Sequence, residues 1–186
     1  MDVEDQTTMA GTTANVLLIT KTELYCANAG DSRCVLSKKG KSKDLSVDQK
    51  PDNPGEKRRI ERANGFVEEN RVNGMLALSR SLGDFEYKNN PIFKVQDQIV
   101  SPMPEITVEK ITSDMEFVII ACDGIWDCMT SQEAVTFVSQ NLTKKKKSEL
   151  SHLISDMFEK NLAKDAASAA GIGCDNMTCI IVEFKR

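Results

Sequence analysis

The sequence predicts an α+β protein in which antiparallel sheets carry helices on their outer faces. Short apolar runs separated by turn dipeptides open the chain and predict strands linked by hairpins. Two helical patterns stand next to each other near the C-terminus, so helices and strands are segregated rather than alternating. Too few strands connect through single helices for a doubly wound parallel sheet. The length of 186 residues favours one domain with a real core.

The opening segment predicts an antiparallel meander. Residues 14–20 and 24–29 are apolar runs separated by a short polar turn, and each predicts a strand. Gly30-Asp31 is a hairpin-type dipeptide, after which residues 33–37 return as a third strand. The basic, glycine-containing stretch 38–43 predicts a loop.

A helix is predicted from Pro54 to about residue 63. Asn53 is a capping residue type, Pro54 suits the first helical position, and Glu56 completes a capping box. Asn64-Gly65 is a typical helix end.

The segment after this helix is irregular. Residues 79–100 mix Gly, Asn, Pro and single aromatics without periodicity. A long irregular segment inside a compact domain is usually a functional loop, and we expect a lid or flap over about residues 85–100.

Regular structure returns after residue 105. Residues 106–111 alternate like a half-buried strand, and residues 115–122 form a second, more apolar one. The capping box that begins at Thr130 opens a helix, and residues 150–162 follow the spacing of an amphipathic helix whose apolar face packs on a core. Residues 177–184 predict a terminal strand.

Charge and hydropathy exclude several classes of function. The net charge of −4 argues against nucleic-acid binding by the whole molecule. No apolar run reaches the roughly 20 residues that span a bilayer, and no signal peptide is evident. We therefore expect a cytoplasmic protein, with the nucleus as the alternative. Lys144–Lys147 is interpreted as a solvated link between helices, and a nuclear-localisation or phosphate-binding role stays open.

The cysteine and histidine content argues against a zinc site. Six cysteines are scattered without a Cys-x-x-Cys pair, and we expect them to be reduced. The only histidine, His152, lies inside the predicted helix at 150–162, where a surface role is expected.

The chemistry of the chain is expected to centre on the end of the strand at 115–122. This apolar run leads directly into Asp123-Gly124, and Asp127 follows one helical turn later. Glycine allows the backbone to approach closely whatever Asp123 holds. Two carboxylates at the mouth of a buried strand suit a hard cation such as Mg²⁺ or Mn²⁺. In the alternative interpretation, Asp123 only caps the following helix.

Two further aspartates share this context. Asp31 and Asp175 also stand where a strand meets a turn, each beside Gly or Asn. If these strand ends converge with that of Asp123, the carboxylates repel one another unless a cation neutralises them.

Seven short motifs occur in the order found in one enzyme family and extend over nearly the whole chain. They are Gly11-Thr12-Thr13-Ala14; Asn28-Ala29-Gly30-Asp31-Ser32-Arg33; Asp48-Gln49-Lys50-Pro51; Glu56 with Arg59-Ile60; Arg71-Val72-Asn73-Gly74 followed by Leu76-Ala77-Leu78-Ser79-Arg80-Ser81-Leu82-Gly83-Asp84; Asp123-Gly124-Ile125-Trp126-Asp127; and Asp175-Asn176-Met177-Thr178. On these motifs the chain resembles the metal-dependent protein serine/threonine phosphatases of type 2C. The family usually has His in place of Gln49.

The resemblance implies a fold and a metal centre. The fold is an antiparallel β-sandwich flanked by helices, in αββα layers, with a variable flap at about residues 85–100. The centre holds two Mg²⁺ or Mn²⁺ ions. Asp123 and Asp175 match ligands of the second ion, and Asp31 and Asp127 match carboxylates that hold a third ion together with Asp123. The substrates would be phosphoserine and phosphothreonine on proteins.

The resemblance covers only the C-terminal two-thirds of the family's catalytic domain. The family's phosphate-binding arginine, its Glu-Asp pair and its Asp-Gly-His-Gly-Gly segment have no match in the 186 residues. We therefore expect a sandwich incomplete at its N-terminus, no general-acid histidine, and little activity from this chain alone. A catalytically silent relative that binds phosphoproteins or another partner is the alternative. A calcium module is disfavoured, because no EF-hand loop is present.

Overall fold

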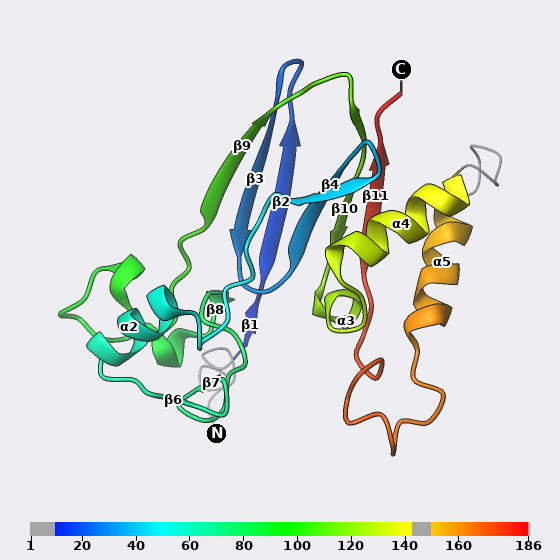
Figure 1. Cartoon of the computed structure of the whole chain (residues 1–186). Coiled ribbons are helices and arrows are strands. Elements are labelled where there is room, and N and C mark those ends of the chain that lie inside the picture. The colour runs from blue at the N-terminus through cyan, green and yellow to red at the C-terminus, as the bar shows by residue number, and fades with distance from the viewer. Residues whose placement is uncertain (1–9, 143–149, 186) are drawn as a thin grey trace. The chain divides into compact units, whose positions relative to one another are not determined.

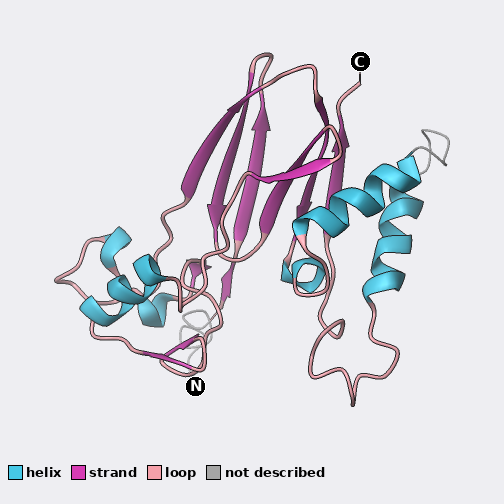
Figure 2. Ribbon diagram, viewed as in Figure 1, coloured by secondary structure: helices cyan, strands magenta, loops and turns pink. Residues whose placement is uncertain are grey.

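The computed structural model describes residues 10–142 and 150–185 and has the α+β composition predicted from the sequence (Figures 1 and 2). Its two larger sheets are a four-stranded sheet of order β11-β10-β4-β5 and a three-stranded sheet of order β2-β3-β9. None of the helices described is long and apolar enough to cross a membrane. The basic run Lys144–Lys147 lies outside the described residues.

The larger elements follow the predicted order. The strands are β1 (Gly11–Thr12), β2 (Ala14–Ile19), β3 (Glu23–Ala29), β4 (Arg33–Lys38), β5 (Lys41–Asp44), β6 (Val67–Glu68), β7 (Arg71–Val72), β8 (Leu82–Gly83), β9 (Glu105–Lys110), β10 (Met115–Ala121) and β11 (Cys179–Glu183). The helices are α2 (Pro54–Arg62), α3 (Asp123–Trp126), α4 (Ser131–Leu142) and α5 (Leu150–Asn161), with short 3₁₀ turns η1 (Phe85–Tyr87) and η2 (Val95–Asp97).

The strand β10 is central in the four-stranded sheet, as its apolar sequence predicts. It pairs antiparallel with β4 on one side and with β11 on the other. Phe117, Val118 and Ile119 are at most 1% exposed. At the end of the strand, Ala121 lies opposite Arg33 in β4 and opposite Cys179 in β11. The pairing of Ala121 on both sides therefore fixes the position at which the chain leaves the sheet after β10.

The predicted meander is wrong after its first hairpin. β3 pairs in the three-stranded sheet and β4 in the four-stranded sheet, so the chain changes sheets at Gly30-Asp31 instead of turning back on itself. The predicted loop at 38–43 is also wrong, because β5 begins at Lys41 and pairs with β4. The turn uses Lys39 and Gly40 at φ values of 51° and 72°, the conformation of a two-residue hairpin.

The helices α4 and α5 form a layer on the four-stranded sheet (Figure 1). α4 packs against β4 and β5, and α5 packs against α4 and β11. The shared core contains the buried side chains Phe117, Ile119, Ile125, Trp126, Val135, Val138, Leu153 and Met157. The capping box predicted at Thr130 is confirmed, because its backbone N–H donates to Glu133 at 2.8 Å and its hydroxyl accepts from the Glu133 N–H at 3.2 Å.

The chain divides into two compact units, each described below by itself. Among the described residues, the first contains residues 10–16, Cys26–Asp31 and Val47–Thr107, and the second contains Leu17–Tyr25, Ser32–Ser46 and residues 108–142 and 150–185. α2 belongs to the first unit and the α4–α5 layer to the second.

The strand β9 has the predicted position but not the predicted burial. Ile106 is 64% exposed and Val108 is 49% exposed, whereas the polar Glu109 is partly buried. Glu109 turns inward because Lys43 donates to its carboxylate at 2.6 Å and Lys38 at 3.4 Å. These ion pairs lower the pKa of Glu109, with the Lys43 hydrogen bond as the main cause.

None of the six cysteines, all of which lie within the described residues, forms a disulfide. Cys26 and Cys34 are buried, whereas Cys174 is exposed. Burial, together with the nearby Cys122, raises the pKa of the Cys179 thiol to about 12.

Candidate active site

Asp123 is the first residue of α3 and closely follows the end of β10, as the sequence predicts. Figure 1 shows α3 at that end of β10. The residue at the helix N-cap is Cys122, so Asp123 is not the cap. Its Oδ1 accepts the Gly124 N–H at 3.0 Å. The Asp127 N–H donates to the Asp123 carbonyl at 2.8 Å. This single helical turn carries both carboxylates of the Asp123–Asp127 motif.

The segment that carries Asp175 lies beside this turn. The Cys122 N–H donates to the Thr178 carbonyl at 3.2 Å, and the Thr178 N–H donates to the Cys122 sulfur at 3.2 Å. A Cβ atom at position 124 would lie 2.3 Å from the Asn176 carbonyl oxygen. Glycine therefore allows the close approach that the sequence predicts, and the group that approaches is the backbone next to Asp175. The pairing of β10 with β11 thus places the Asp123 and Asp175 segments side by side.

Asp31 belongs to the other compact unit and has a cationic partner there. It is only 3% exposed, and Lys50 Nζ donates to its Oδ2 at 2.5 Å. Gln49 fixes the turn before it, because its side chain accepts the Gly30 N–H at 2.7 Å and donates to the Asn28 carbonyl at 3.2 Å. Gln49 can make both contacts because an amide offers a donor and an acceptor. The buried Asp31 is thus held by the Asp48–Pro51 motif.

No group of three His, Cys, Asp or Glu side chains that could hold a metal ion occurs within residues 10–142 and 150–185. The chain brings the Asp123, Asp127 and Asp175 segments to one end of β10 and β11 but does not assemble them into such a cluster. The metal ligands Asp31, Asp123, Asp127 and Asp175 stay a prediction. His152 is exposed on α5, consistent with the surface role expected of it.

Glu56 is the charged residue whose role the sequence pattern missed. The pattern predicts a capping box, but no side chain caps α2, and the Asn53 side chain donates instead to the Asp48 carbonyl at 2.7 Å. Glu56 is 7% exposed and accepts from Arg59 at 2.5 Å, Arg80 at 2.6 Å and Ser79 at 2.7 Å. Glu56 and Arg59 stand three residues apart, the spacing that brings two side chains together on one helix face.

The pKa of Glu56 is lowered by these partners. Burial alone would raise the pKa, but hydrogen bonds from Arg80 and Ser79 and the charge of Arg59 outweigh it. The carboxylate is therefore fully ionised at neutral pH and can hold both guanidinium groups.

The two arginines clamp the base of the flap-like segment. Arg59 donates to the Gln98 carbonyl at 3.1 Å and to the Ser79 carbonyl at 2.5 Å, while Arg80 donates to the Met103 carbonyl at 3.0 Å. The strand-like contact between Arg80 and Ser101 closes the same base. The two ends of the segment between residues 81 and 98 are thus held together by these contacts.

The flap-like segment also has internal anchors. The Gln98 side chain is 5% exposed and donates to the Asn90 carbonyl at 2.7 Å and to the Phe93 carbonyl at 2.9 Å. Lys88 donates to the Ser81 carbonyl at 2.7 Å, and burial lowers the pKa of its ammonium group. These contacts hold the loop in one conformation although it has little regular structure.

Comparison with known proteins identifies relatives along nearly the whole chain. The family model described as protein phosphatase 2C matches residues 2–170. The chain is 50% identical over 174 residues to "Protein phosphatase 2C homolog 2" of Aspergillus fumigatus, covering 94% of this chain and 40% of that protein. It is 48% identical over 183 residues to "Probable protein phosphatase 2C 5" of Paramecium tetraurelia, covering 98% of this chain and 61% of that protein.

Solved structures agree with these sequence matches. A crystal structure of a phosphatase from Toxoplasma gondii superposes with a TM-score of 0.75 at 30% identity, covering 87% of this chain and 48% of that chain. The present chain therefore spans about two fifths to three fifths of the length of the curated relatives named above. Since the family model extends over most of the sequence and the α+β fold matches, the chain belongs to the protein phosphatase 2C family.

Proposed function

We propose that this chain supplies part of the active site of a metal-dependent protein serine/threonine phosphatase. Family membership supports the reaction class, the hydrolysis of phosphoserine and phosphothreonine on proteins. The observation that carries the proposal is the side-by-side placement of the Asp123 and Asp175 segments at one end of β10 and β11. If the Asp123 and Asp175 carboxylates converge at this end of the two strands, a cation would relieve their repulsion.

The residues present fit a Mg²⁺ or Mn²⁺ centre in part. Asp123 and Asp175 offer the hard oxygen ligands that both ions prefer, and we assign them to one ion of a pair. Asp127 and Asp31 are assigned to a third, weaker position together with Asp123. When bound, such ions generate a nucleophilic water at neutral pH and neutralise the phosphoryl oxygens. The chain's own contribution is to hold the carboxylates, through the Gly124–Asn176 approach and through the Gln49 and Lys50 contacts around Asp31.

We further propose that the site is completed by residues outside this sequence. The 186 residues contain no Asp-Gly-His-Gly-Gly segment, and the only histidine is His152. The complete catalytic domain would be a β-sandwich in αββα layers, of which this chain forms one partial domain with its flap at about residues 85–100. Phosphorylated proteins would be its substrates, and the missing segment its first structural partner.

The test is hydrolysis of a phosphothreonine peptide in Mn²⁺, by the chain alone and by the chain mixed with the N-terminal segment of a type 2C relative. We expect turnover only in the mixture, and its loss with Asp123→Asn. The matched control is Asp52→Asn, which changes an exposed aspartate in the other unit and should leave turnover unchanged.

Two outcomes would contradict the proposal. If the two pieces associate but stay inactive, the chain is instead a silent binding module. If the chain alone turns over substrate with Mn²⁺, the metal ligands differ from those assigned to Asp31, Asp123, Asp127 and Asp175.

A further inference from the structure

The structure assigns Arg33 a role in the reaction: we propose that it positions the turn carrying Asp123 and Asp127 by holding Trp126. The effect on the reaction rests on the proposed function, in which Asp123 and Asp127 are metal ligands. Its structural part stands on contacts within the second compact unit alone, because Arg33, α3 and α4 all belong to that unit.

One guanidinium group joins three elements at this end of the sheet. Arg33 is the first residue of β4 and lies opposite Ala121, the last residue of β10. Its Cζ lies 5.1 Å from the centroid of the Trp126 ring, and its Nη1 donates to the Ser131 hydroxyl at 3.1 Å. Ser131 begins α4. Arg33 therefore links β4, α3 and α4 through one side chain.

Trp126 connects Arg33 to the backbone that carries the Asp123 and Asp127 carboxylates. It is 7% exposed, and its indole N–H donates to the Ala121 carbonyl at 2.7 Å. The ring is thus fixed at its edge by β10 and at its face by the guanidinium of Arg33. Trp126 lies directly before Asp127 and three residues after Asp123. A shift of the ring must move the backbone that carries both carboxylates.

Helical hydrogen bonds alone hold this turn weakly. α3 has four residues, and a helix this short gains little from its own hydrogen bonds. The side chains of Ile125 and Trp126 are buried in the core below α4 and α5. Arg33 adds a stacking contact with the Trp126 ring and a hydrogen bond to Ser131. Both depend on the planar guanidinium group, so a lysine cannot reproduce them in full.

The test uses the 186-residue chain, in which Trp126 is the only tryptophan. The variants are Arg33→Met, which keeps much of the length without the charge, and Arg33→Lys, which keeps the charge without the planar group. Hydrogen exchange is measured for the N–H groups of Asp127, Cys128 and Met129, which donate to the Asp123 and Ile125 carbonyls. We expect exchange about tenfold faster in Arg33→Met and an intermediate increase in Arg33→Lys. Trp126 emission should change in parallel.

The matched control is Val138→Ala, a cavity in the same core on α4. It lowers stability without touching Arg33, and we expect exchange at residues 127–129 to rise no more than in the rest of the unit. The proposal is overturned if Arg33→Met leaves exchange there within about twofold of the wild type. An equal local increase in Val138→Ala would overturn it as well.

The consequence for catalysis is measured in the mixture with the N-terminal segment. We expect the Mn²⁺ concentration for half-maximal turnover to rise about tenfold in Arg33→Met, while the KM for the peptide stays unchanged. An unchanged Mn²⁺ requirement would limit Arg33 to a structural role and overturn its part in the reaction. If the wild-type mixture shows no turnover, the proposed function fails, whereas hydrogen exchange still decides the role of Arg33 in the turn.

Discussion

Gly124 lies where one added methyl group would meet backbone rather than a mobile side chain. Its Cβ position is 2.3 Å from the Asn176 carbonyl oxygen and 3.1 Å from the carbonyl carbon. Backbone cannot move aside as cheaply as the end of a side chain, so any larger residue must separate α3 from the segment that precedes β11. The close approach was predictable from an Asp-Gly pair after a buried strand. Its partner, Asn176, lies 52 positions away in the sequence and was not predictable, because no local pattern encodes that contact.

Gly124→Ala should lower the free energy of unfolding by about 2 kcal/mol, because the added methyl group forces α3 away from the backbone at Asn176. Chemical denaturation monitored by Trp126 emission measures the change. Gly55→Ala is the matched control, because a Cβ there meets nothing within 4 Å and the position is helical. Equal stability of Gly124→Ala and the wild type would show that α3 and the Asn176 backbone are not held together at this contact.

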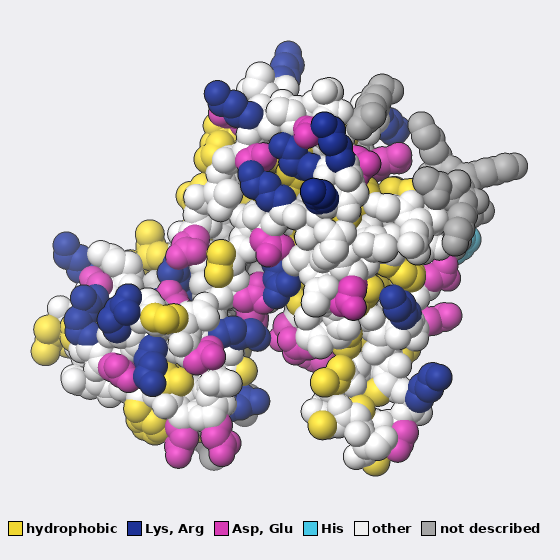
Figure 3. All heavy atoms as spheres, viewed as in Figure 1, with side chains coloured by type: hydrophobic (Ala, Val, Ile, Leu, Met, Phe, Trp, Pro, Cys, Tyr) yellow, Lys and Arg dark blue, Asp and Glu magenta, His cyan; other side chains and the backbone are white. Residues whose placement is uncertain are grey.

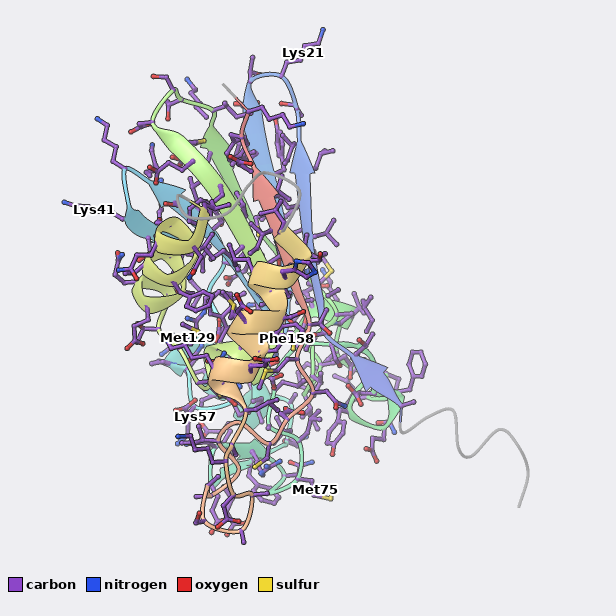
Figure 4. All side chains as sticks on the ribbon, turned by 90° about the vertical axis from the view of Figure 1, so that its right-hand side faces the viewer. Lys21, Lys41, Lys57, Met75, Met129 and Phe158 are labelled. Atoms are coloured by element: carbon purple, nitrogen blue, oxygen red, sulfur yellow. The ribbon has the colours of Figure 1, made fainter. Side chains whose placement is uncertain are left out.

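Among the elements, those with strong local signals were predicted well. β10 was recognisable from its uninterrupted apolar run and α4 from its capping box. β5 was missed because its sequence, Lys-Ser-Lys-Asp, has no apolar residue to mark it as a strand. It is an edge strand, basic side chains gather on the surface over it (Figure 3), and Lys41 projects away from the sheet (Figure 4). Exposed lysines on an edge oppose pairing with another chain.

The edge of β5 is also covered by a side chain from a distant part of the sequence. Gln132 on α4 accepts the Ser42 N–H at 2.9 Å and donates to the Gly40 carbonyl at 2.9 Å. Polar strands of this kind are specified by such tertiary contacts, which explains why their sequence predicts a loop.

The hydrogen bonds of Glu56 with Arg59 and Arg80 connect α2 to the base of the flap-like segment. Their loss should therefore destabilise both α2 and this segment. Glu56→Gln should lower the free energy of unfolding at pH 7 by about 3 kcal/mol, since it leaves Arg59 and Arg80 without their buried counter-charge. Because the pKa of Glu56 lies below its ordinary value of 4.5 in the folded protein, its stabilisation is present above that value. The stabilisation is lost as the pH falls through the lower, folded-state pKa.

Thermal unfolding measured from pH 7 to pH 3 should therefore show that Glu56→Gln loses less stability on acidification than the wild type does. The control is Glu61→Gln on the same helix, whose carboxylate is half exposed and lies 3.9 Å from Lys57. Exposed pairs contribute little, so this variant should match the wild type at every pH. A Glu56→Gln curve parallel to the wild type would contradict the assigned ionisation of Glu56.

On the scale of the whole molecule, the sequence predicts the fold class and the order of elements but not which side chains are covered. The apolar run of β2 and the alternating apolar residues of β9 imply buried side chains, yet Val16, Leu18, Ile106 and Val108 are between 49% and 64% exposed. Alternation reports that a strand has two unlike faces, and tertiary packing decides which face is covered. The assignment of strands to sheets also depends on contacts far apart in sequence, so the change of sheet at Gly30-Asp31 was missed.

Ile106→Thr should leave the free energy of unfolding within about 0.5 kcal/mol of the wild type, because the side chain is already 64% exposed. It should reduce binding of a hydrophobic dye and self-association, measured by fluorescence and light scattering. Val118→Thr is the matched control in β10, where full burial of the new hydroxyl should cost at least about 1 kcal/mol. A comparable loss in both variants would mean that Ile106 is covered in solution.

The six cysteines, none of which forms a disulfide, provide a chemical probe of local opening. Cys174 is exposed and should be alkylated at once, whereas Cys26 and Cys34 are shielded until the chain around them opens. Cys26 lies in the first compact unit and Cys34 in the second, only eight positions apart. Mass spectrometry that follows the alkylation of Cys26 and of Cys34 over time would show whether the two compact units unfold together or one after the other.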